Sequence, residues 1–297
     1  MIDRGLGFMR AARRIGLSPK GHIMRQIFAV IITVGLFSSI AFGESLNVAI
    51  GPTLAQPSSS YGAAGLPGVW NSLTAVHNTT TFNLKDLNGN VTDVNVWQFG
   101  GTELRSANDP GTFGDDQTLM DHCLITYTTN LETCLFFRQL DAADYEVIIY
   151  AWMPNRPDVL SYTNCDEEPG NPDYFVGGGW SGQHQLGVTH SRHIATVTTQ
   201  FNGLLRVHSG IAPGENPADG SACNGVQIRQ LPPKAPADMN CDGAVNGIDI
   251  RLFVEAVLDP EAYYQSAPTC RIDNGDTNND TQVTIGDTLS FVAALVN

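Results

Sequence analysis

Apolar and polar positions alternate in short runs between about residue 44 and residue 230, a pattern that predicts β-strands. The run YEVIIYAW, Tyr145 to Trp152, is apolar on both faces apart from Glu146. Such a run is typical of a central strand that is covered on both sides. HIATVTTQF and LLRVHSG follow as further strands, and no helical period interrupts them. The pattern therefore predicts a mainly β fold, a jelly-roll-like β-sandwich.

Two stretches of this region predict hairpins. TFNLKDLNGNVTDVNVW places Asn88-Gly89, a pair that favours tight hairpin turns, between two alternating runs. CLITYTTNLETC places polar residues between two short runs that begin and end in cysteine. Across such a hairpin Cys123 and Cys134 would face each other, so we expect a disulfide between them.

A proline-rich segment divides the chain. LPPKAPA, residues 231–237, holds three prolines in seven residues and reads as a semi-rigid linker. Residues 44–230 then form the β-sandwich domain and residues 238–297 a second, small domain. The sandwich carries the main core, because all four tryptophans precede the linker: Trp70, Trp97, Trp152 and Trp180.

The segment after the linker is an internal duplication. Shifted by 38 residues, DMNCDGAVNGIDIRLFVEAVL lies over DTNNDTQVTIGDTLSFVAALV. Acid and amide positions coincide in register with an apolar set. The run after each acidic loop has helical spacing, which predicts two loop–helix units.

The spacing of oxygen-bearing residues in each loop matches calcium chemistry. Calcium takes six to eight oxygen ligands, and a 12-residue EF-hand-type loop supplies them from positions 1, 3, 5, 7, 9 and 12. Gly243 at position 6 provides the sharp turn, whereas the second loop has Thr281 there. We therefore expect two calcium ions, the second bound more weakly. The predicted ligands are Asp238, Asn240, Asp242, the Ala244 carbonyl, Asn246 and Asp249, then Asp276, Asn278, Asp280, the Gln282 carbonyl, Thr284 and Asp287.

The duplicated D-x-N-x-D-G-x-V-N-x-x-D loop, followed by a helix and ending in Asp at position 12, resembles a type I dockerin over Asp238–Asn297. The resemblance implies a small α-helical, calcium-binding domain that docks to a cohesin partner, usually to bring polysaccharide-degrading modules onto a scaffold. Loop positions 10 and 11 contact cohesin in that family, often as Ser-Thr pairs. They are Gly247 and Ile248, then Ile285 and Gly286, in this chain. Partner identity therefore stays open between a cohesin-like and another cell-surface protein.

The segment between the two loops is longer than in cellulosomal dockerins and carries a cysteine. Position 4 of the first loop points away from the metal, so a Cys241–Cys270 disulfide fits this dockerin-like arrangement. The segment before the linker also resembles, through its strand pattern and DYEVIIYAW, galactose-binding-like β-sandwich domains of secreted bacterial proteins.

The first 43 residues read as a signal peptide. A basic stretch precedes an apolar run, Ile27 to Ile40, and Ala41-Phe42-Gly43 fits a cleavage site. The alternative is an uncleaved anchor. After residue 43 lie 29 of the 30 acidic side chains and only 10 of the 16 basic ones. Such a surface repels nucleic acid and anionic membranes. We expect a secreted protein, either free or attached to a cell surface, with no nucleic-acid or membrane partner.

Six cysteines fit an oxidising compartment and disulfide use, although they allow fifteen full pairings. No Cys-x-x-Cys spacing indicates a zinc or redox motif. Cys165 and Cys223 are left to each other only by elimination.

Several groups in the sandwich are candidates for chemistry. Asp115, Asp116 and Asp121 offer paired carboxylates for glycoside hydrolysis or, more simply, an acidic loop or calcium ligands. His184, His190 and His193 offer a metal site, although the last two would face opposite sides of a strand. Trp70 and Trp180 follow glycine-rich turns and offer platforms for sugar rings, whereas core packing is the ordinary use of tryptophan.

These observations favour a non-catalytic, secreted calcium-binding protein whose sandwich binds extracellular carbohydrate. The alternatives are a polysaccharide hydrolase or lyase carrying a dockerin, and a purely structural surface protein.

Overall fold

The structure is a computed structural model that describes residues 44–128 and 132–296. The predicted signal peptide, residues 1–43, lies outside the described residues. Among the helices within these ranges, none combines the length and the apolarity that crossing a bilayer requires.

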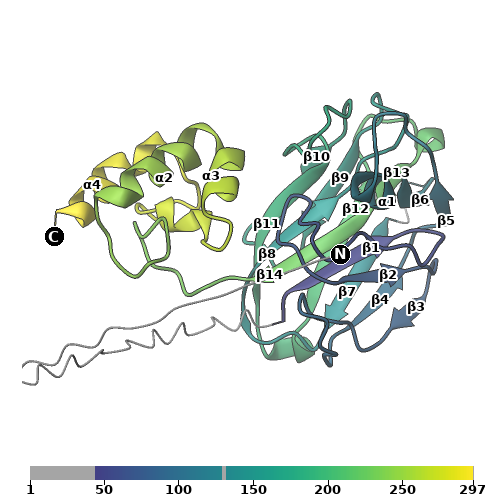
Figure 1. The fold of residues 1–297 in the computed structure, drawn as a ribbon, viewed down its shortest axis with the longest axis horizontal. Coiled ribbons are helices and arrows are strands. Elements are labelled where there is room, and N and C mark those ends of the chain that lie inside the picture. Colours follow the sequence, from purple (N-terminus) through teal and green to yellow (C-terminus); the bar gives the residue numbers. More distant parts are fainter. Residues whose placement is uncertain (1–43, 129–131, 297) are drawn as a thin grey trace, which may run out of the picture. The chain divides into compact units, whose positions relative to one another are not determined.

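Residues from 44 to 230 form a β-sandwich, as the alternating pattern predicts (Figure 1). One sheet has five strands in the order β11-β8-β14-β1-β2, and all its pairs are antiparallel except β1 with β2. The YEVIIYAW segment supplies β8 at an inner position of this sheet, where its last six residues are buried. The strands are β1 (Leu46–Ile50), β2 (Trp70–Leu73), β8 (Ala143–Tyr150), β11 (His190–Val197) and β14 (Gly225–Gln230).

The facing sheet has six strands in the order β10-β9-β12-β7-β4-β3, and a three-stranded sheet, β13-β6-β5, lies beside the two. All pairs in both are antiparallel. The strands are β3 (Thr79–Thr81), β4 (Asn95–Phe99), β5 (Glu103–Ser106), β6 (His122–Thr126), β7 (Thr133–Arg138), β9 (Ser161–Cys165), β10 (Tyr174–Val176), β12 (Leu205–Ile211) and β13 (Ser221–Cys223).

Alternate residues of the two large sheets fill the space between them. Val147 and Ile149 of β8 meet Leu135 and Phe137 of β7 in one buried cluster. The opposite face of β8 is also covered, because Ile148 and Tyr150 pack with Trp70, Trp152 and α1 (Asp115–Met120). Burial on both faces explains why Glu146 is the only charged residue from Tyr145 to Tyr150.

One of the two predicted hairpins forms. Asp86 Oδ1 accepts hydrogen bonds from the Asn88 and Asn90 backbone N–H groups at 2.9 and 2.8 Å, and Lys85 bridges Val91 antiparallel. These bonds confirm the tight turn. The CLITYTTNLETC prediction is wrong, because its two runs are β6 and β7 of different sheets. Alternation sets which face of a strand is buried but not which strand lies next to it.

The second segment is helical, with one repeat on each side of a stacked aromatic pair. Phe253 and Phe291, which occupy the same position of the two repeats, stack with ring centroids 4.1 Å apart. Val245 and Val283, also equivalent, pack against the same cluster. The helices are α2 (Gly247–Leu258), α3 (Pro260–Ser266), α4 (Thr288–Leu295) and two short 3-10 turns, η3 (Ile272–Gly275) and η4 (Ile285–Asp287). Two further 3-10 turns, η1 (Gln200–Asn202) and η2 (Pro217–Asp219), lie in the sandwich.

The cysteines behave differently in the two segments. Cys241 and Cys270 form the predicted disulfide, with Cα atoms 5.4 Å apart. The other predicted bridge is absent from the described residues, where Cys123, Cys134, Cys165 and Cys223 are buried and free. The Cys123–Cys134 prediction is wrong because the two residues lie in different sheets. Cys165 and Cys223, whose pairing the sequence left open, are not paired with each other.

Candidate functional site

The first acidic loop folds two aspartates inward. Asp238 accepts the Asp242 N–H at 3.2 Å and the Gly243 N–H at 2.9 Å, one on each carboxylate oxygen. Asp249, eleven residues later, accepts the Met239 N–H on Oδ1 and the Asn246 N–H on Oδ2, both at 2.8 Å. The first and last residues of the loop therefore turn the surrounding backbone toward its centre.

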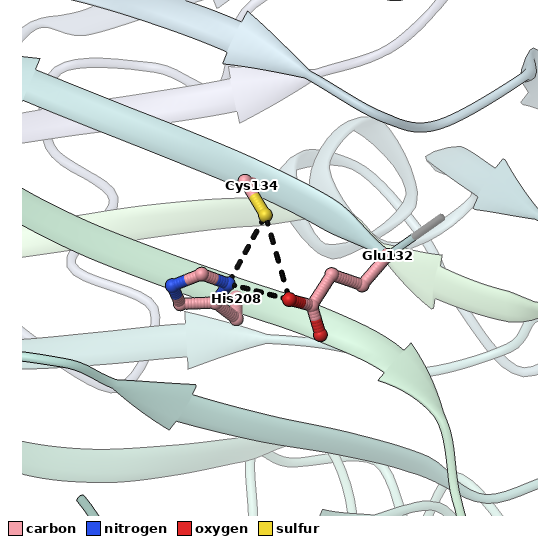
Figure 2. Close-up of side chains that lie close together, drawn as sticks. All are labelled: Glu132, Cys134 and His208. Carbon is pink, nitrogen blue, oxygen red and sulfur yellow. Dashed lines mark hydrogen bonds and ion pairs between the residues drawn. The ribbon is translucent and has the colours of Figure 1, made fainter. Parts of the chain in front are cut away.

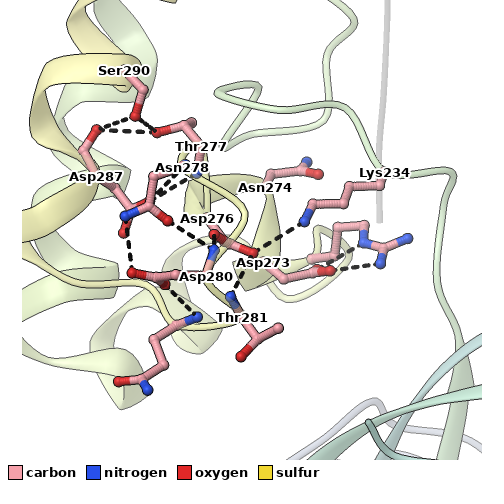
Figure 3. A network of polar contacts seen from close by, with 12 residues as sticks. Lys234, Asp273, Asn274, Asp276, Thr277, Asn278, Asp280, Thr281, Asp287 and Ser290 are labelled. Carbon is pink, nitrogen blue, oxygen red and sulfur yellow. Dashed lines mark hydrogen bonds and ion pairs between the residues drawn. The ribbon is translucent and has the colours of Figure 1, made fainter.

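The second loop repeats this pattern bond for bond, and Figure 3 shows the contacts around Asp276 and Asp287. Asp276 accepts the Asp280 N–H at 3.0 Å and the Thr281 N–H at 3.3 Å. Asp287 accepts the Thr277 N–H on Oδ1 and the Thr284 N–H on Oδ2, both at 2.9 Å. The duplication read from the sequence is thus also a duplication of backbone geometry.

These four aspartates are buried, with exposed fractions of 3% for Asp238, 0% for Asp249, 5% for Asp276 and 0% for Asp287. Carboxylates are rarely buried without a positive partner. Among the ion pairs of the described residues, only Lys234 reaches one of them, at 3.4 Å from Asp276. Helix capping explains part of this arrangement, because Asp249 and Asp287 complete capping boxes with Asn246 and Thr284. It does not explain the burial of Asp238 and Asp276.

Position 6 adopts the same left-handed backbone in both loops. Gly243 has φ of 87° and Thr281 has φ of 73°. A β-branched residue is strained in this region, whereas glycine is not. The sequence difference between the loops is therefore a difference in backbone strain.

The remaining predicted ligands lie around the open side of each loop. Asn240 and Asn278 donate to the carboxylates of Asp242 and Asp280 at 2.8 and 2.9 Å. These two aspartates, Ala244 and Gln282 are exposed, and Asn246 and Thr284 are half-buried. The predicted partner-contact residues are all exposed: Gly247, Ile248, Ile285 and Gly286.

In the sandwich, three residues that the sequence singled out converge near Tyr61. They are Asp116, His184 and Trp180. Tyr61 Oη lies 2.5 Å from Asp116 Oδ1 and 2.7 Å from His184 Nε2. Trp180, half-buried, packs edge-on against His184 with centroids 5.3 Å apart. Burial raises the pKa of the Asp116 carboxyl, but hydrogen bonds from His184 and Tyr61 outweigh it and hold that pKa below its ordinary value. Burial and the Asp116 hydrogen bond raise the pKa of Tyr61, so its hydroxyl stays protonated and donates.

The other acidic candidates serve local structure. Asp115 accepts the Ser58 backbone N–H at 2.8 Å and the Ser58 hydroxyl at 2.6 Å. Asp121 is 1% exposed and accepts from Thr112 Oγ1 at 2.8 Å. The sandwich therefore does not present these three carboxylates as a free catalytic pair.

Of the two further histidine candidates, His190 lies against this cluster and His193 lies apart from it. His190 contacts Tyr150 and His184, whereas His193 lies 2.6 Å from Glu168. The three histidines do not share one site. The prediction that Trp70 offers a sugar platform is wrong, because Trp70 is 2% exposed and packs in the core with its Nε1 bonded to the Tyr61 carbonyl at 3.2 Å.

Sequence reasoning missed two groups on the outer face of the six-stranded sheet. Trp97, Phe99 and Phe136 stack there in the register Trp97↔Phe136. Glu132, Cys134 and His208 bring their ligand atoms within 4.8 Å of one another, and no other described His, Cys, Asp and Glu side chains do so in a set of three. The alternation in VNVWQF and TCLFFR marks the outward positions, but the pairing of β7 with β12 is not visible in the sequence.

Comparisons with known proteins assign no family. No family model matches the chain, and no curated protein matches it. Among solved structures, a chain of the plant peptide RALF23 complex with FER and LLG2 matches with TM-score 0.37 and 12% identity, over 65% of this chain and 41% of that chain. The CBM36-1 domain of a xylanase from the hindgut metagenome of Trinervitermes trinervoides gives 0.24 and 11%, over 43% and 86%. The C-terminal CBM6 of LamC from Zobellia galactanivorans gives 0.24 and 9%, over 46% and 99%. Likenesses of this size show neither a family nor a function for this chain.

Proposed function

We propose that this protein is a secreted calcium-binding protein in which residues 238–297 form a dockerin-like attachment module and the β-sandwich binds extracellular carbohydrate. The observation that carries the proposal is the pair of acidic loops with the same hydrogen-bond pattern, each with two buried aspartates. The four carboxylates have one lysine contact among the described ion pairs. A divalent cation in each loop supplies the charge that this burial requires.

Calcium fits the donor set better than other metals. Each loop offers carboxylate, amide or hydroxyl, and backbone carbonyl oxygens and no nitrogen or sulfur, which is the preference of a hard cation. Asp238 and Asp249 would hold the first ion from opposite ends of their loop, and Asp276 and Asp287 the second. The ion then sets the angle at which α2 and α4 leave their loops.

An apolar groove between α2 and α4 supports the attachment role. Phe253, Val254 and Val257 line one side, and Phe291, Val292 and Leu295 the other. Ile248 and Ile285 are 63% and 78% exposed. These are among the positions that the dockerin resemblance assigns to partner contact. A cohesin-like or other cell-surface protein with an apolar patch is the partner that we propose.

Trp180 and its neighbours support carbohydrate binding by the sandwich. A half-exposed indole offers an apolar surface to the face of a sugar ring, and the partly exposed Asp116 carboxylate near it offers hydrogen-bond acceptors. Tyr61 bonds to both, which holds this polar edge in place. Binding without turnover is favoured over hydrolysis, because Asp115 and Asp121 are engaged in local hydrogen bonds.

Calcium removal tests the first part. Circular dichroism of the full chain should lose helical signal when a chelator strips the ions and regain it on adding calcium. Replacing both leading aspartates, Asp238→Ala with Asp276→Ala, should abolish this response. Asp259→Ala, which removes a helix N-cap outside both loops, is the matched control and should keep it. Equal helix content and no calcium binding in all conditions would contradict the proposal.

A glycan array paired with a reducing-sugar assay tests the second part. We expect Trp180→Ala to lose binding and Trp97→Ala, the same truncation on β4, to retain it. Loss in Trp97→Ala alone would move the site to the β4–β7 face. Release of reducing sugar by the wild type would support the enzyme alternative instead.

A further inference from the structure

Three side chains of different chemistry meet on the outer face of the six-stranded sheet (Figure 2). Cys134 on β7 and His208 on β12 are direct cross-strand partners, so their side chains leave the sheet on the same side. Glu132 precedes β7 and reaches back over the pair. The cluster is thus held by neighbouring strands and not by a loop alone.

The three ligand atoms form a compact triangle. Cys134 Sγ lies 3.0 Å from His208 Nδ1 and 3.7 Å from a Glu132 carboxylate oxygen, and that oxygen lies 3.0 Å from Nδ1. Sulfur, nitrogen and oxygen ligands of a tetrahedral zinc ion are separated by about 3.3–3.6 Å, given the usual bond lengths. Adjustments of about half an ångström would centre an ion between them.

A nucleophile relay does not fit this geometry. In such a relay the thiol and the carboxylate contact different nitrogens of the imidazole ring. Here the thiol and the Glu132 carboxylate both contact Nδ1, and Nε2 makes no hydrogen bond to the carboxylate nearest to it, that of Asp166. Convergence of three donor atoms on one point is the arrangement that a metal ion requires. Cys134 forms no disulfide, so its sulfur is available as a ligand.

The second ring nitrogen faces a carboxylate of its own. His208 Nε2 lies 3.3 Å from Asp166 Oδ1, and the other oxygen of Asp166 pairs with Arg206 at 3.1 Å. Nε2 makes no hydrogen bond to any described residue, so Asp166 acts on it through its negative charge alone. That charge favours the proton on Nε2 and leaves Nδ1 as the metal ligand, which makes Asp166 a positioning residue for Nδ1.

We propose that Cys134, His208 and Glu132 form a second kind of metal site, for a thiophilic divalent cation of the zinc type. The thiolate and the imidazole select against calcium, which prefers oxygen alone. One carboxylate and one thiolate balance the two charges of the ion, and the thiol proton leaves to solvent on binding. Glu132 is 36% exposed on its side chain, so a fourth position faces solvent, open to water or a ligand.

Cobalt(II) titration of the reduced full chain, with the acidic loops saturated by calcium, tests the proposal. One equivalent should produce thiolate-to-cobalt charge-transfer absorption, and zinc should displace it. Cys134→Ser should lose the band, while Cys165→Ser, which removes a buried free thiol that faces the core, should keep it. The same band in Cys134→Ser, or no band in the wild type, would overturn the site.

A second variant tests the site independently, in case Cys134→Ser fails to fold. Asp166→Asn changes a partly exposed side chain and leaves all three ligands in place. It should keep the charge-transfer band and weaken cobalt affinity by roughly 10–100-fold, as loss of such a supporting carboxylate does. Unchanged cobalt affinity in Asp166→Asn would show that Asp166 is not a positioning residue for His208. Excess calcium should change neither the charge-transfer band nor the cobalt affinity.

Discussion

At the scale of single residues, the two acidic loops have the same hydrogen bonds around their buried aspartates but differ in the residue at position 6. Gly243 and Thr281 share the left-handed backbone, and an added Cβ at Gly243 meets no atom within 4 Å. Clashes with neighbouring atoms therefore do not distinguish glycine from a larger residue at position 6. The distinction comes from the left-handed backbone conformation itself.

We predict that Thr281→Gly tightens calcium binding at the second loop and that Gly243→Ala weakens it at the first. A left-handed conformation costs a residue with a Cβ about 1–2 kcal/mol, or roughly 5–30-fold in affinity if the strain is released when the ion leaves. Isothermal titration calorimetry of the full chain resolves the two sites. Equal affinities in the wild type would contradict the expected weakness of the second.

Another prediction concerns His190, which is fully buried on β11. Burial, reinforced by the charge of Arg192 and by His184, lowers the pKa of His190 well below its ordinary value of 6.5. The folded protein then binds fewer protons than the unfolded chain near that pH, so the free energy of unfolding should fall as the pH drops below about 6.5. Denaturant titrations at several pH values measure this slope, and His190→Gln should flatten it. A slope that is the same in both proteins would count against this assignment.

At the scale of elements, the helices of the second segment depend on groups outside themselves. The duplicated Phe253 and Phe291 stack between α2 and α4, and the Cys241–Cys270 bridge ties the first loop to the turn before η3. A segment of about sixty residues has a thin core and gains from such cross-links.

We predict that reducing this disulfide destabilises the helical segment by roughly 3–4 kcal/mol on the chain-entropy account, given a sequence separation of 29 residues. Helical circular dichroism followed through a urea titration, with and without reductant, measures it. The double variant Cys241→Ala with Cys270→Ala is the control. Since the other four cysteines are free, reductant should leave its transition unchanged.

At the scale of the whole molecule, the five-stranded sheet encloses a charge network. Glu146 on β8 pairs with Arg192 of β11 at 3.0 Å and with Arg229 of β14 at 3.1 Å, and all three side chains are at most 6% exposed. Three different strands thus bring one carboxylate against two guanidinium groups.

Glu146→Gln should destabilise the protein by about 3–5 kcal/mol, because it leaves buried charge uncompensated. Asp93→Asn, the same loss of charge at an exposed position, should cost far less. Thermal and urea unfolding followed by tryptophan fluorescence compare the two, since all four tryptophans lie in the sandwich. Similar costs for both variants would show that the network does not contribute as proposed.

What the sequence determines by itself is local. The register of the 38-residue repeat, the position of the Asn88-Gly89 turn and the buried character of β8 were all predictable, because each follows from spacing within a short stretch or between two copies of one motif. The Cys241–Cys270 bridge was expected from the resemblance of the repeat to a dockerin. Oxygen-bearing residues at alternate loop positions need no distant partner to be recognised.

Only the tertiary structure decided which strands are neighbours. It placed β6 and β7 in different sheets, buried Trp70, gathered Asp116, His184 and Trp180 around Tyr61, and set Cys134 opposite His208, 74 residues away. An alternating strand shows which of its faces is apolar, but many strands share that pattern. Their pairing is settled by packing between segments far apart in the chain, and the sandwich sites depend on that pairing.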